Sequence, residues 1–481
     1  MIKVLFVASE GSPFCKTGGL GDVIGSLPKE LIKNDIYAGV IMPKYGDISS
    51  EFKERMTECI RVTVPLSWRN QYCGLEKIEY EGIPFYFIDN EYYFRRAGMY
   101  GFYDEGERFA FFCRAVLEIL PYLDFDPDIL HCHDWQTALV PVFKKAFYPQ
   151  LKKPIIFTIH NLHYQGVFPQ SVLGDILGLG EEYFTSDNLE YYGKVNYLKG
   201  GLLYADVLTT VSPSYAEEIQ TPSYGQNLDG VLRQRKERLF GILNGIDYTI
   251  YNPDADPHIF VSYNHKTWQT KENNKIGLQK LLGLPEKGGT PLLAVVSRLV
   301  NQKGLDLIAE VLDEILALDV QMVVLGTGEE KYVSIFDNAA WRLPNQIATR
   351  ICFNEILAHK IYAGADIFLM PSYFEPCGLG QMIALRYGSI PVVRETGGLK
   401  DTVYPFDGKT SQGNGFTFQG YNSQEMLAVI KKAVHFYYQK DLWSCVVQNA
   451  MLTDCSWYRS ARSYRSLYQV LIEKCYDKKV D

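Results

Sequence analysis

The first residues that could do chemistry are a lysine and three glycines near the N-terminus. The segment 16–22 reads Lys-Thr-Gly-Gly-Leu-Gly-Asp and follows an apolar run, 2–8, that predicts a buried strand. Glycines let the backbone approach a ligand closely, and a helix predicted over 23–31 would direct its free N–H groups at an anion. Lys16 adds a positive charge at the same place.

A second glycine turn lies far downstream. Residues 396–401 read Thr-Gly-Gly-Leu-Lys-Asp and again follow a strand-like run, 390–394. Either Gly-Gly pair could simply turn the chain. The lysine and the repetition favour a ligand-binding turn in each half instead. The spacing does not match a dinucleotide-binding fingerprint, because Ile24 stands where its third glycine would be.

Two cations follow a predicted strand of the second half. Arg298 comes directly after Ser297, at the end of the strand predicted over 292–296, and Lys303 follows one short loop later. Cations at the carboxyl edge of a strand suit a diphosphate, since they neutralise charge on a phosphate leaving group and arginine can bridge two oxygens. The alternative is that both are ordinary surface residues.

The segment 371–381, Pro-Ser-Tyr-Phe-Glu-Pro-Cys-Gly-Leu-Gly-Gln, lies between a strand predicted over 367–370 and a helix predicted from about 382 to 387. Glycines at a helix start leave N–H groups that can bind an anion. Phosphate would repel the carboxylate of Glu375, so we interpret this residue as a group on the sugar side. A helix-capping carboxylate is the alternative.

Histidines follow two predicted strands of the first half, in the segments 131–135 and 160–166. Their alternation suggests zinc, but no dense Cys/His cluster or His-Glu-x-x-His motif accompanies them. The segment 254–256, Asp-Ala-Asp, could be taken for the metal-binding motif of another sugar-transferase class. Prolines on both sides favour a turn there. We therefore expect no metal site.

Length and composition limit the classes to which the protein can belong. The 481 residues, 47% of them hydrophobic, suffice for two substantial cores. A net charge of −8 argues against general nucleic-acid binding. The ten cysteines form no Cys-x-x-Cys pair, which indicates reduced thiols. Neither a secretory signal nor a membrane-spanning run is present, so we expect a soluble, cytoplasmic protein with disorder confined to its last few residues.

Short strand-like runs alternate with longer helical patterns, which predicts parallel sheets with crossover helices. The strands predicted in the first half are 2–8, 38–42, 85–88, 129–132, 155–159 and 207–211. Those predicted in the second half are 292–296, 322–325, 350–353, 367–370 and 390–393, with a helix over 305–318. A turn-rich passage, 243–254, separates the halves. Two doubly wound domains would place their ligand sites at the strand ends, facing one cleft.

Taken together, the segments 16–20, 131–135, 160–166 and 375–381, with Arg298 and Lys303, resemble the bacterial glycogen synthase and starch synthase family. The resemblance spans nearly the whole chain. It implies an α/β, GT-B fold with two Rossmann-like domains, 1–243 and 244–456, and a final helix within 457–481 that returns to the first. It also implies metal-independent transfer of α-glucose, with retention, from ADP-glucose to the non-reducing 4-hydroxyl end of glycogen or another α-1,4-glucan.

The resemblance assigns roles by position. The implied catalytic residues are His160, Arg298, Lys303 and Glu375. The implied donor contacts are Lys16, Gly18, Gly19, Asp22, Asn161, Asn244, Phe353, Cys377, Gly378, Leu379 and Gly380, and the implied acceptor contacts are Tyr100, Asp134 and Trp135. No cofactor, nucleic acid or membrane partner is implied.

Three positions depart from the family pattern. Phe353 stands where some members have tyrosine, Gly380 replaces a common threonine, and Ile383 breaks a Glu-x-seven-Glu pattern of related transferases. Two other functions remain open: a transferase that uses UDP-glucose, and a glucan-binding or regulatory protein without turnover. The retained cations and Glu375 argue against the second.

Overall fold

The computed structural model describes residues 1–477, which divide into two compact units. Unit 1 comprises Met1–Asn244 with Trp457–Asp481, and unit 2 comprises Gly245–Ser456. The sequence places this boundary between 243 and 244. Residues 478–481, the last part of the predicted final helix and of the segment expected to be disordered, lie outside the described residues.

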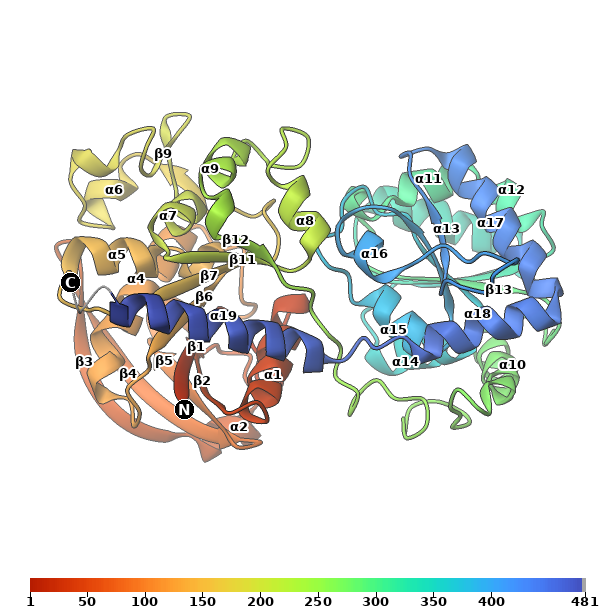
Figure 1. Ribbon diagram of the computed structural model, residues 1–481, viewed down its shortest axis with the longest axis horizontal. Coiled ribbons are helices and arrows are strands. Elements are labelled where there is room, and N and C mark those ends of the chain that lie inside the picture. The colour runs from red at the N-terminus through yellow and green to blue at the C-terminus, as the bar shows by residue number, and fades with distance from the viewer. Residues whose placement is uncertain (478–481) are drawn as a thin grey trace. The chain divides into compact units, whose positions relative to one another are not determined.

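Unit 1 is built on a nine-stranded sheet (Figure 1). In spatial order its strands are β12 (Leu239–Gly241), β11 (Val207–Thr210), β7 (Ile155–Ile159), β6 (Ile129–His133), β1 (Ile2–Val7), β2 (Ile36–Pro43), β5 (Ile83–Asp89), β4 (Arg69–Tyr80) and β3 (Thr57–Leu66). Neighbouring strands from β12 to β5 are parallel, whereas β4 is antiparallel to both β5 and β3. A small antiparallel sheet contains β8 (Val167–Pro169), β10 (Lys194–Asn196) and β9 (Glu190–Tyr191).

Helices cover this sheet, and the last one comes from the C-terminal end of the chain (Figure 1). They are α1 (Gly19–Ile32), α2 (Ser50–Arg55), α3 (Glu91–Phe94), α4 (Glu105–Ile119), α5 (Leu139–Phe147), α6 (Val172–Asp175), α7 (Tyr197–Tyr204), α8 (Pro213–Glu218), α9 (Asp229–Gln234) and α19 (Trp457–Asp477). Helix α19 contacts α1, and the Tyr468 hydroxyl lies 2.9 Å from His131 Nδ1 on β6. The final helix thus contributes to the core of unit 1.

Unit 2 has a six-stranded, all-parallel sheet. In spatial order its strands are β15 (Ile347–Arg350), β14 (Gln321–Leu325), β13 (Leu292–Val296), β16 (Ile367–Met370), β17 (Ile390–Arg394) and β18 (Phe416–Phe418). Its helices are α10 (Lys271–Leu282), α11 (Leu305–Glu310), α12 (Leu312–Leu316), α13 (Glu330–Arg342), α14 (Glu355–Gly364), α15 (Gly380–Arg386), α16 (Gly397–Thr402), α17 (Ser423–Tyr438) and α18 (Lys440–Leu452).

Both sheets have a point at which the strand order reverses. In unit 2 the first strand, β13, has β14 on one side and β16 on the other; in unit 1, β1 lies between β2 and β6. The loops that leave two such neighbouring strands diverge to opposite faces of the sheet and open a crevice at their carboxyl ends, where α/β proteins bind ligands. The predicted class of two doubly wound α/β domains is confirmed, and each unit has one such point.

Two predicted elements of unit 2 were wrong in detail. The strand predicted over 350–353 is instead Ile347–Arg350. It ends there because its partner β14 ends at Leu325, which pairs with Arg350, so that Phe353 lies in an exposed loop before α14. The helix predicted over 305–318 is interrupted at Val311, whose φ of −119° is not helical, and so forms α11 and α12.

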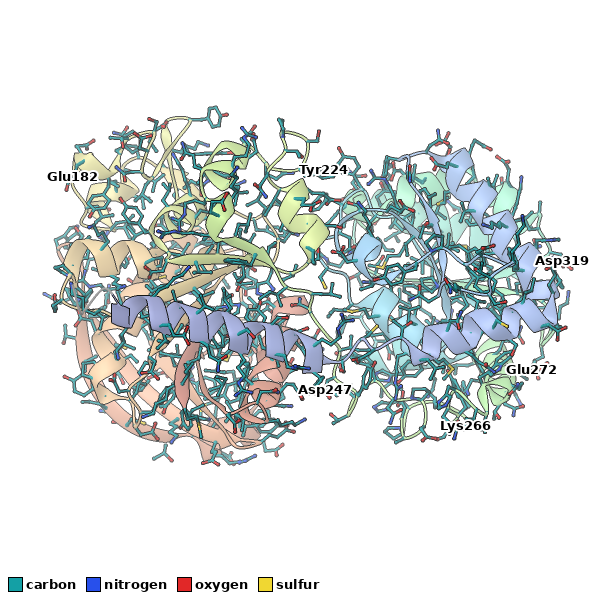
Figure 2. All side chains as sticks on the ribbon, viewed as in Figure 1. Glu182, Tyr224, Asp247, Lys266, Glu272 and Asp319 are labelled. Atoms are coloured by element: carbon teal, nitrogen blue, oxygen red, sulfur yellow. The ribbon has the colours of Figure 1, made fainter. Side chains whose placement is uncertain are left out.

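Charged side chains such as Glu182, Lys266 and Asp319 lie at the periphery (Figure 2) and are exposed, while β1, β6 and β7 in unit 1 and β13, β14 and β16 in unit 2 are largely buried. Within residues 1–477, the helices are all too short or too polar to cross a lipid bilayer.

Candidate functional site

The structure divides the predicted site residues between the two units. Unit 1 carries Lys16, Gly18, Gly19, Asp22, Tyr100, Asp134, Trp135, His160, Asn161 and Asn244. Unit 2 carries Arg298, Lys303, Phe353, Glu375, Cys377, Gly378, Leu379 and Gly380. Most of these residues follow the carboxyl ends of β1, β6 and β7 in unit 1, and of β13 and β16 in unit 2. In each unit, these residues therefore lie beside the point where the strand order of the sheet reverses.

The glycine turn after β1 folds over a buried carboxylate. Glu10, only 5% exposed, accepts hydrogen bonds from Thr17 N at 2.5 Å and from Gly18 N at 3.4 Å. Burial raises the pKa of Glu10, and the hydrogen bonds from Thr17 and Gly18 offset only part of this effect. On the outer side of the turn, the Lys16 ammonium lies 3.2 Å from Asp22 Oδ1. The turn is therefore held from inside and presents a lysine outside.

Histidines from β6 and the loop after β7 lie side by side. His133 Nδ1 lies 2.9 Å from His160 Nε2, and His131 Nε2 lies 2.6 Å from the Thr158 hydroxyl. Burial lowers the pKa of His160 to about 3 and that of His133 well below its ordinary value. Both imidazoles are therefore neutral near neutral pH, so His160 can hydrogen-bond a hydroxyl group but brings no charge to a phosphate.

Asp134 connects the loops after β6 and β7. Its Oδ1 accepts a hydrogen bond from His160 N at 2.8 Å, and burial raises its pKa to about 7. Its φ of 57° with ψ of 178° is a backbone conformation that residues other than glycine rarely adopt, and such strain persists only where surrounding contacts impose it. Asp134 therefore fixes the position of His160 as well as offering a carboxylate.

The other predicted residues of unit 1, which are Tyr100, Asn161, Asn244 and Trp135, differ in their contacts and burial. The Tyr100 hydroxyl lies 2.8 Å from Ser9 Oγ, and Asn161 Oδ1 accepts a hydrogen bond from His163 N. Asn244 is buried, and its Oδ1 has no hydrogen-bond partner among the described residues. Trp135 is 9% exposed. It packs so closely beneath the loop after β7 that a Cβ at Gly166 would lie 2.3 Å from its ring.

In unit 2, an ion pair joins the loops after β13 and β16. Lys303 Nζ lies 2.7 Å from Glu375 Oε2, and the Ser372 hydroxyl donates to the same oxygen at 2.9 Å. Gly304, with a φ of 68°, brings the Lys303 turn against β16, since a Cβ there would lie 2.0 Å from Pro371 O. Arg298, on the same edge of the sheet, is exposed.

The second glycine turn supports the Glu375 loop. Gly398 N donates to Glu375 O at 3.0 Å, and a Cβ on Gly397 would lie 2.0 Å from the same carbonyl oxygen. Gly397 also has a φ of 44°, which disfavours any side chain. Close packing therefore explains why these positions are glycine, and direct ligand binding by this turn stays a prediction.

The amide-rich segment that follows Glu375 is also fixed from within. Gln381 Nε2 donates to Cys377 O and Gly378 O, both at 2.9 Å, and Gly378 takes a φ of 73°. Phe353 is 79% exposed in the loop between β15 and α14, so its ring can stack on a planar group such as a nucleobase.

The Asp254–Asp256 segment, considered above as a metal motif, forms a turn in which Ala255 N donates to Asn252 O. Asp256 is buried, and its Oδ2 accepts from the Tyr387 hydroxyl and lies 2.6 Å from His359 Nδ1. These bonds give Asp256 a structural role within unit 2.

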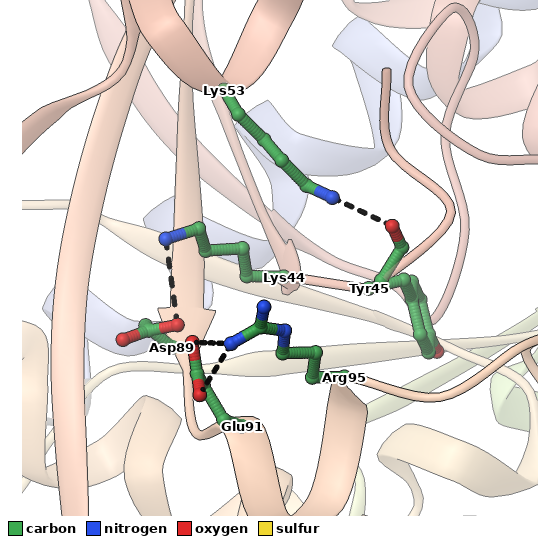
Figure 3. A pocket seen from close by; sticks show the side chains of 7 residues that line it. Lys44, Tyr45, Lys53, Asp89, Glu91 and Arg95 are labelled. Atoms are coloured by element: carbon green, nitrogen blue, oxygen red, sulfur yellow. Dashed lines mark hydrogen bonds and ion pairs between the residues drawn. The ribbon is translucent and has the colours of Figure 1, made fainter. Parts of the chain in front are cut away.

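A separate polar cavity of about 260 Å³ lies in unit 1, beside the ends of β2 and β5 (Figure 3). Its cations are balanced locally: Lys44 lies 3.5 Å from Asp89, Arg95 pairs with Glu91 at 2.9 Å, and Lys53 Nζ donates to Gly46 O at 2.6 Å. The cavity is lined by none of the predicted site residues.

Sequence reasoning missed two residues that hold the site together, Glu10 and Ser372. Each is a polar residue shortly after a buried strand, the same signal that selected Arg298. Their bonding partners are a backbone segment and another side chain, which the sequence does not identify.

Comparisons with known proteins agree with this arrangement. The family model of the starch synthase catalytic domain matches residues 3–234, and that of group 1 glycosyl transferases matches residues 283–440. A glycogen synthase from Desulforamulus reducens is 57% identical over 98% of this chain and 99% of its own length. A glycogen synthase from Clostridium acetobutylicum is 54% identical over 98% of this chain and 100% of its own length.

Solved structures are also similar to this chain. The catalytic domain of starch synthase IV from Arabidopsis thaliana, bound to ADP and acarbose, has a TM-score of 0.91 and 36% identity, covering 98% of this chain and 99% of that one. Sucrose-phosphate synthase from Thermosynechococcus elongatus has a TM-score of 0.63 and 15% identity, covering 98% and 100%. The second likeness shows the fold alone.

Proposed function

Because this chain belongs to the glycogen synthase and starch synthase family of GT-B glycosyltransferases, we propose that it transfers α-D-glucose from ADP-glucose to the non-reducing 4-hydroxyl end of an α-1,4-glucan, with retention of configuration. The observation that carries this proposal is the Lys303–Glu375 pair, 2.7 Å apart, beside the point where the strand order of unit 2 reverses. It combines a cation for a diphosphate with a carboxylate for a sugar.

The residues of unit 2 bind the nucleotide end of the donor in this proposal. Arg298 and Lys303 neutralise the diphosphate as it leaves, and charge-assisted hydrogen bonds of this kind are stronger than neutral ones. The amides of the segment 378–380 and Cys377 add contacts to the phosphates or sugar, and Phe353 stacks on adenine. When Lys303 turns to a phosphate, the Glu375 carboxylate becomes available to accept a hydrogen bond from a glucose hydroxyl.

The residues of unit 1 bind the sugar and the acceptor. Neutral His160, with Asn161 and Asn244, contacts the transferred glucose, while the turn with Lys16, Gly18, Gly19 and Asp22 contacts the donor phosphates. Tyr100, Asp134 and Trp135 belong to the acceptor side. During transfer the bond from glucose C1 to the phosphate oxygen breaks and a bond to the acceptor O4 forms on the same face. The departing phosphate takes the acceptor proton.

Initial rates with labelled ADP-glucose and UDP-glucose, each with glycogen as acceptor, test this proposal. We expect incorporation from ADP-glucose to be faster, and the new label to be released by β-amylase, which removes α-1,4-linked units from non-reducing ends. Faster transfer from UDP-glucose would contradict the assigned donor. Glycogen binding without transfer from either donor would instead indicate a glucan-binding protein.

A further inference from the structure

The loop that joins β1 to α1 contains a carboxylate for which the proposed mechanism has no use. Glu10 Oε2 accepts hydrogen bonds from Thr17 N at 2.5 Å, from Thr17 Oγ1 at 3.3 Å and from Gly18 N at 3.4 Å. Two of these donors are backbone N–H groups of the glycine turn. Glu10 therefore occupies, from inside the protein, a position on the turn that an anion could otherwise take.

Nothing cationic compensates this carboxylate in the described part of the chain, where Glu10 forms no ion pair with lysine or arginine. It is 5% exposed, and burial raises its pKa. Burying a carboxylate that only amides and a hydroxyl bind costs desolvation free energy. An apolar side chain would fill the same space without this cost. This arrangement points to a role in the geometry of the turn.

That geometry concerns Lys16 in particular. Thr17 and Gly18, which Glu10 holds, directly follow Lys16. On its other side, the start of α1 approaches so closely that a Cβ on Gly21 would lie 2.4 Å from Lys16 Cβ and 3.5 Å from Glu10 Oε2. Ser12 N also donates to Gly21 O at 3.0 Å, which ties the loop to the helix start. The Lys16 backbone is thus fixed between Glu10 and Gly21.

We propose that Glu10 is a positioning residue for the transfer reaction: by binding the N–H groups of Thr17 and Gly18, it holds Lys16 and the first turn of α1 in the orientation that receives the phosphates of the nucleotide-sugar. This inference rests on the proposed function, in which Lys16 contacts those phosphates. Glu10 itself touches neither substrate and acts through the turn.

Two substitutions separate positioning from packing. Glu10→Ala removes all three hydrogen bonds, and we expect the KM for ADP-glucose to rise about tenfold or more, because small displacements of a binding group are costly in catalysis. The KM for glycogen should stay within about twofold of wild type. Glu10→Gln keeps an oxygen acceptor for Thr17 N and should restore most of the donor affinity. Glu54→Ala, an exposed glutamate on α2, is the matched control.

A double-mutant cycle with Lys16 supplies a second test. If Glu10 acts through Lys16, Lys16→Ala combined with Glu10→Ala should raise the donor KM no further than Lys16→Ala alone, since interacting residues are non-additive. Independent effects would multiply. Calorimetry of ADP binding to the wild type, the two single variants and the double variant should show the same pattern without depending on turnover. Circular dichroism identifies any variant that fails to fold.

The outcomes distinguish the two proposals. A wild-type protein that neither transfers glucose from ADP-glucose nor binds ADP would overturn the proposed function, and this inference with it. An active wild type whose folded Glu10→Ala variant keeps its donor KM and ADP affinity would overturn the inference alone. So would multiplicative effects in the cycle, or equal loss of donor and glycogen affinity. Should Glu10→Ala not fold, Glu10→Leu, which fills the same space without accepting a hydrogen bond, and its combination with Lys16→Ala decide by the same criteria.

Discussion

Replacing Lys303 by alanine removes one of the two cations that the proposed mechanism assigns to the departing diphosphate. Its ammonium lies 2.7 Å from Glu375 Oε2, and 15% of its side chain is exposed. A donor that stabilises developing negative charge contributes about 3–4 kcal/mol to a transition state, equivalent to about 10²–10³ in kcat. We expect Lys303→Ala to lower kcat by this factor in the transfer of labelled glucose to glycogen, with little change in glycogen affinity.

The same substitution also affects stability, and the two effects can be separated. Glu375, with 7% of its side chain exposed, would keep the Ser372 hydroxyl but lose its cation. Breaking a fully buried pair costs about 3–5 kcal/mol, and partial exposure of Lys303 reduces that figure here. Lys303→Ala should therefore lower Tm. Adding Glu375→Gln removes the unpaired charge, so the double variant should regain Tm. Because Glu375 also contacts the sugar in our proposal, the kcat of the double variant is compared with that of Glu375→Gln alone and should be lower.

Lys432→Ala, an exposed lysine on α17, is the matched control and should change neither kcat nor Tm appreciably. Our reasoning about the leaving group would be refuted if Lys303→Ala, folded and saturated with donor, kept kcat within about threefold of wild type. A loss of kcat that the double variant reversed together with Tm would instead assign Lys303 a structural role.

Three further predictions concern Asp134, Gly397 and the need for a metal ion. Because burial raises the pKa of Asp134 from 3.8 to about 7, its native carboxyl keeps a proton that the unfolded chain has lost, so its contribution to stability falls as pH rises through that range. The Tm of Asp134→Asn relative to wild type should increase between about pH 4 and about pH 7, and a constant difference would contradict the assigned shift. Gly397→Ala should lower stability by about 1–3 kcal/mol in denaturant unfolding and reduce transfer, since its Cβ would meet Glu375 O at 2.0 Å, whereas Gly289→Ala, with no atom within 4 Å of its Cβ, should do neither. Transfer after exhaustive EDTA treatment should equal that of the untreated protein, and a loss restored by a divalent cation would disprove metal-independent transfer.

The alternation of apolar runs and helical patterns was enough to predict two doubly wound sheets. The buried parallel strand β13 is a continuous apolar run, β7 is interrupted only by Thr158, and the predicted bounds of both equal those observed. The hairpin of β3 and β4 was missed because the prediction relied on such apolar runs. Most β3 side chains are at least partly exposed, so the strand has no apolar run, and Ser67 at its turn takes a φ of 53° without a glycine.

The candidate site was predictable to the extent that its residues follow strand ends. Arg298, Lys303 and Glu375 satisfy that rule, and the strand order confirms that the loops after β13 and β16 are neighbours. The sequence could not show that Lys303 pairs with Glu375, because the contact joins residues 72 positions apart. Nor could it show why Gly397 is glycine, since the reason is a carbonyl oxygen on another loop.

A crystal structure with ADP bound tests the central claim most directly. We predict that the diphosphate contacts Arg298 and Lys303, that Lys303 Nζ has moved from Glu375 towards a phosphate oxygen, and that adenine stacks on Phe353. ADP bound away from these residues, for example in the cavity lined by Lys44 and Arg95 (Figure 3), would contradict the assignment of unit 2 as the nucleotide-binding unit.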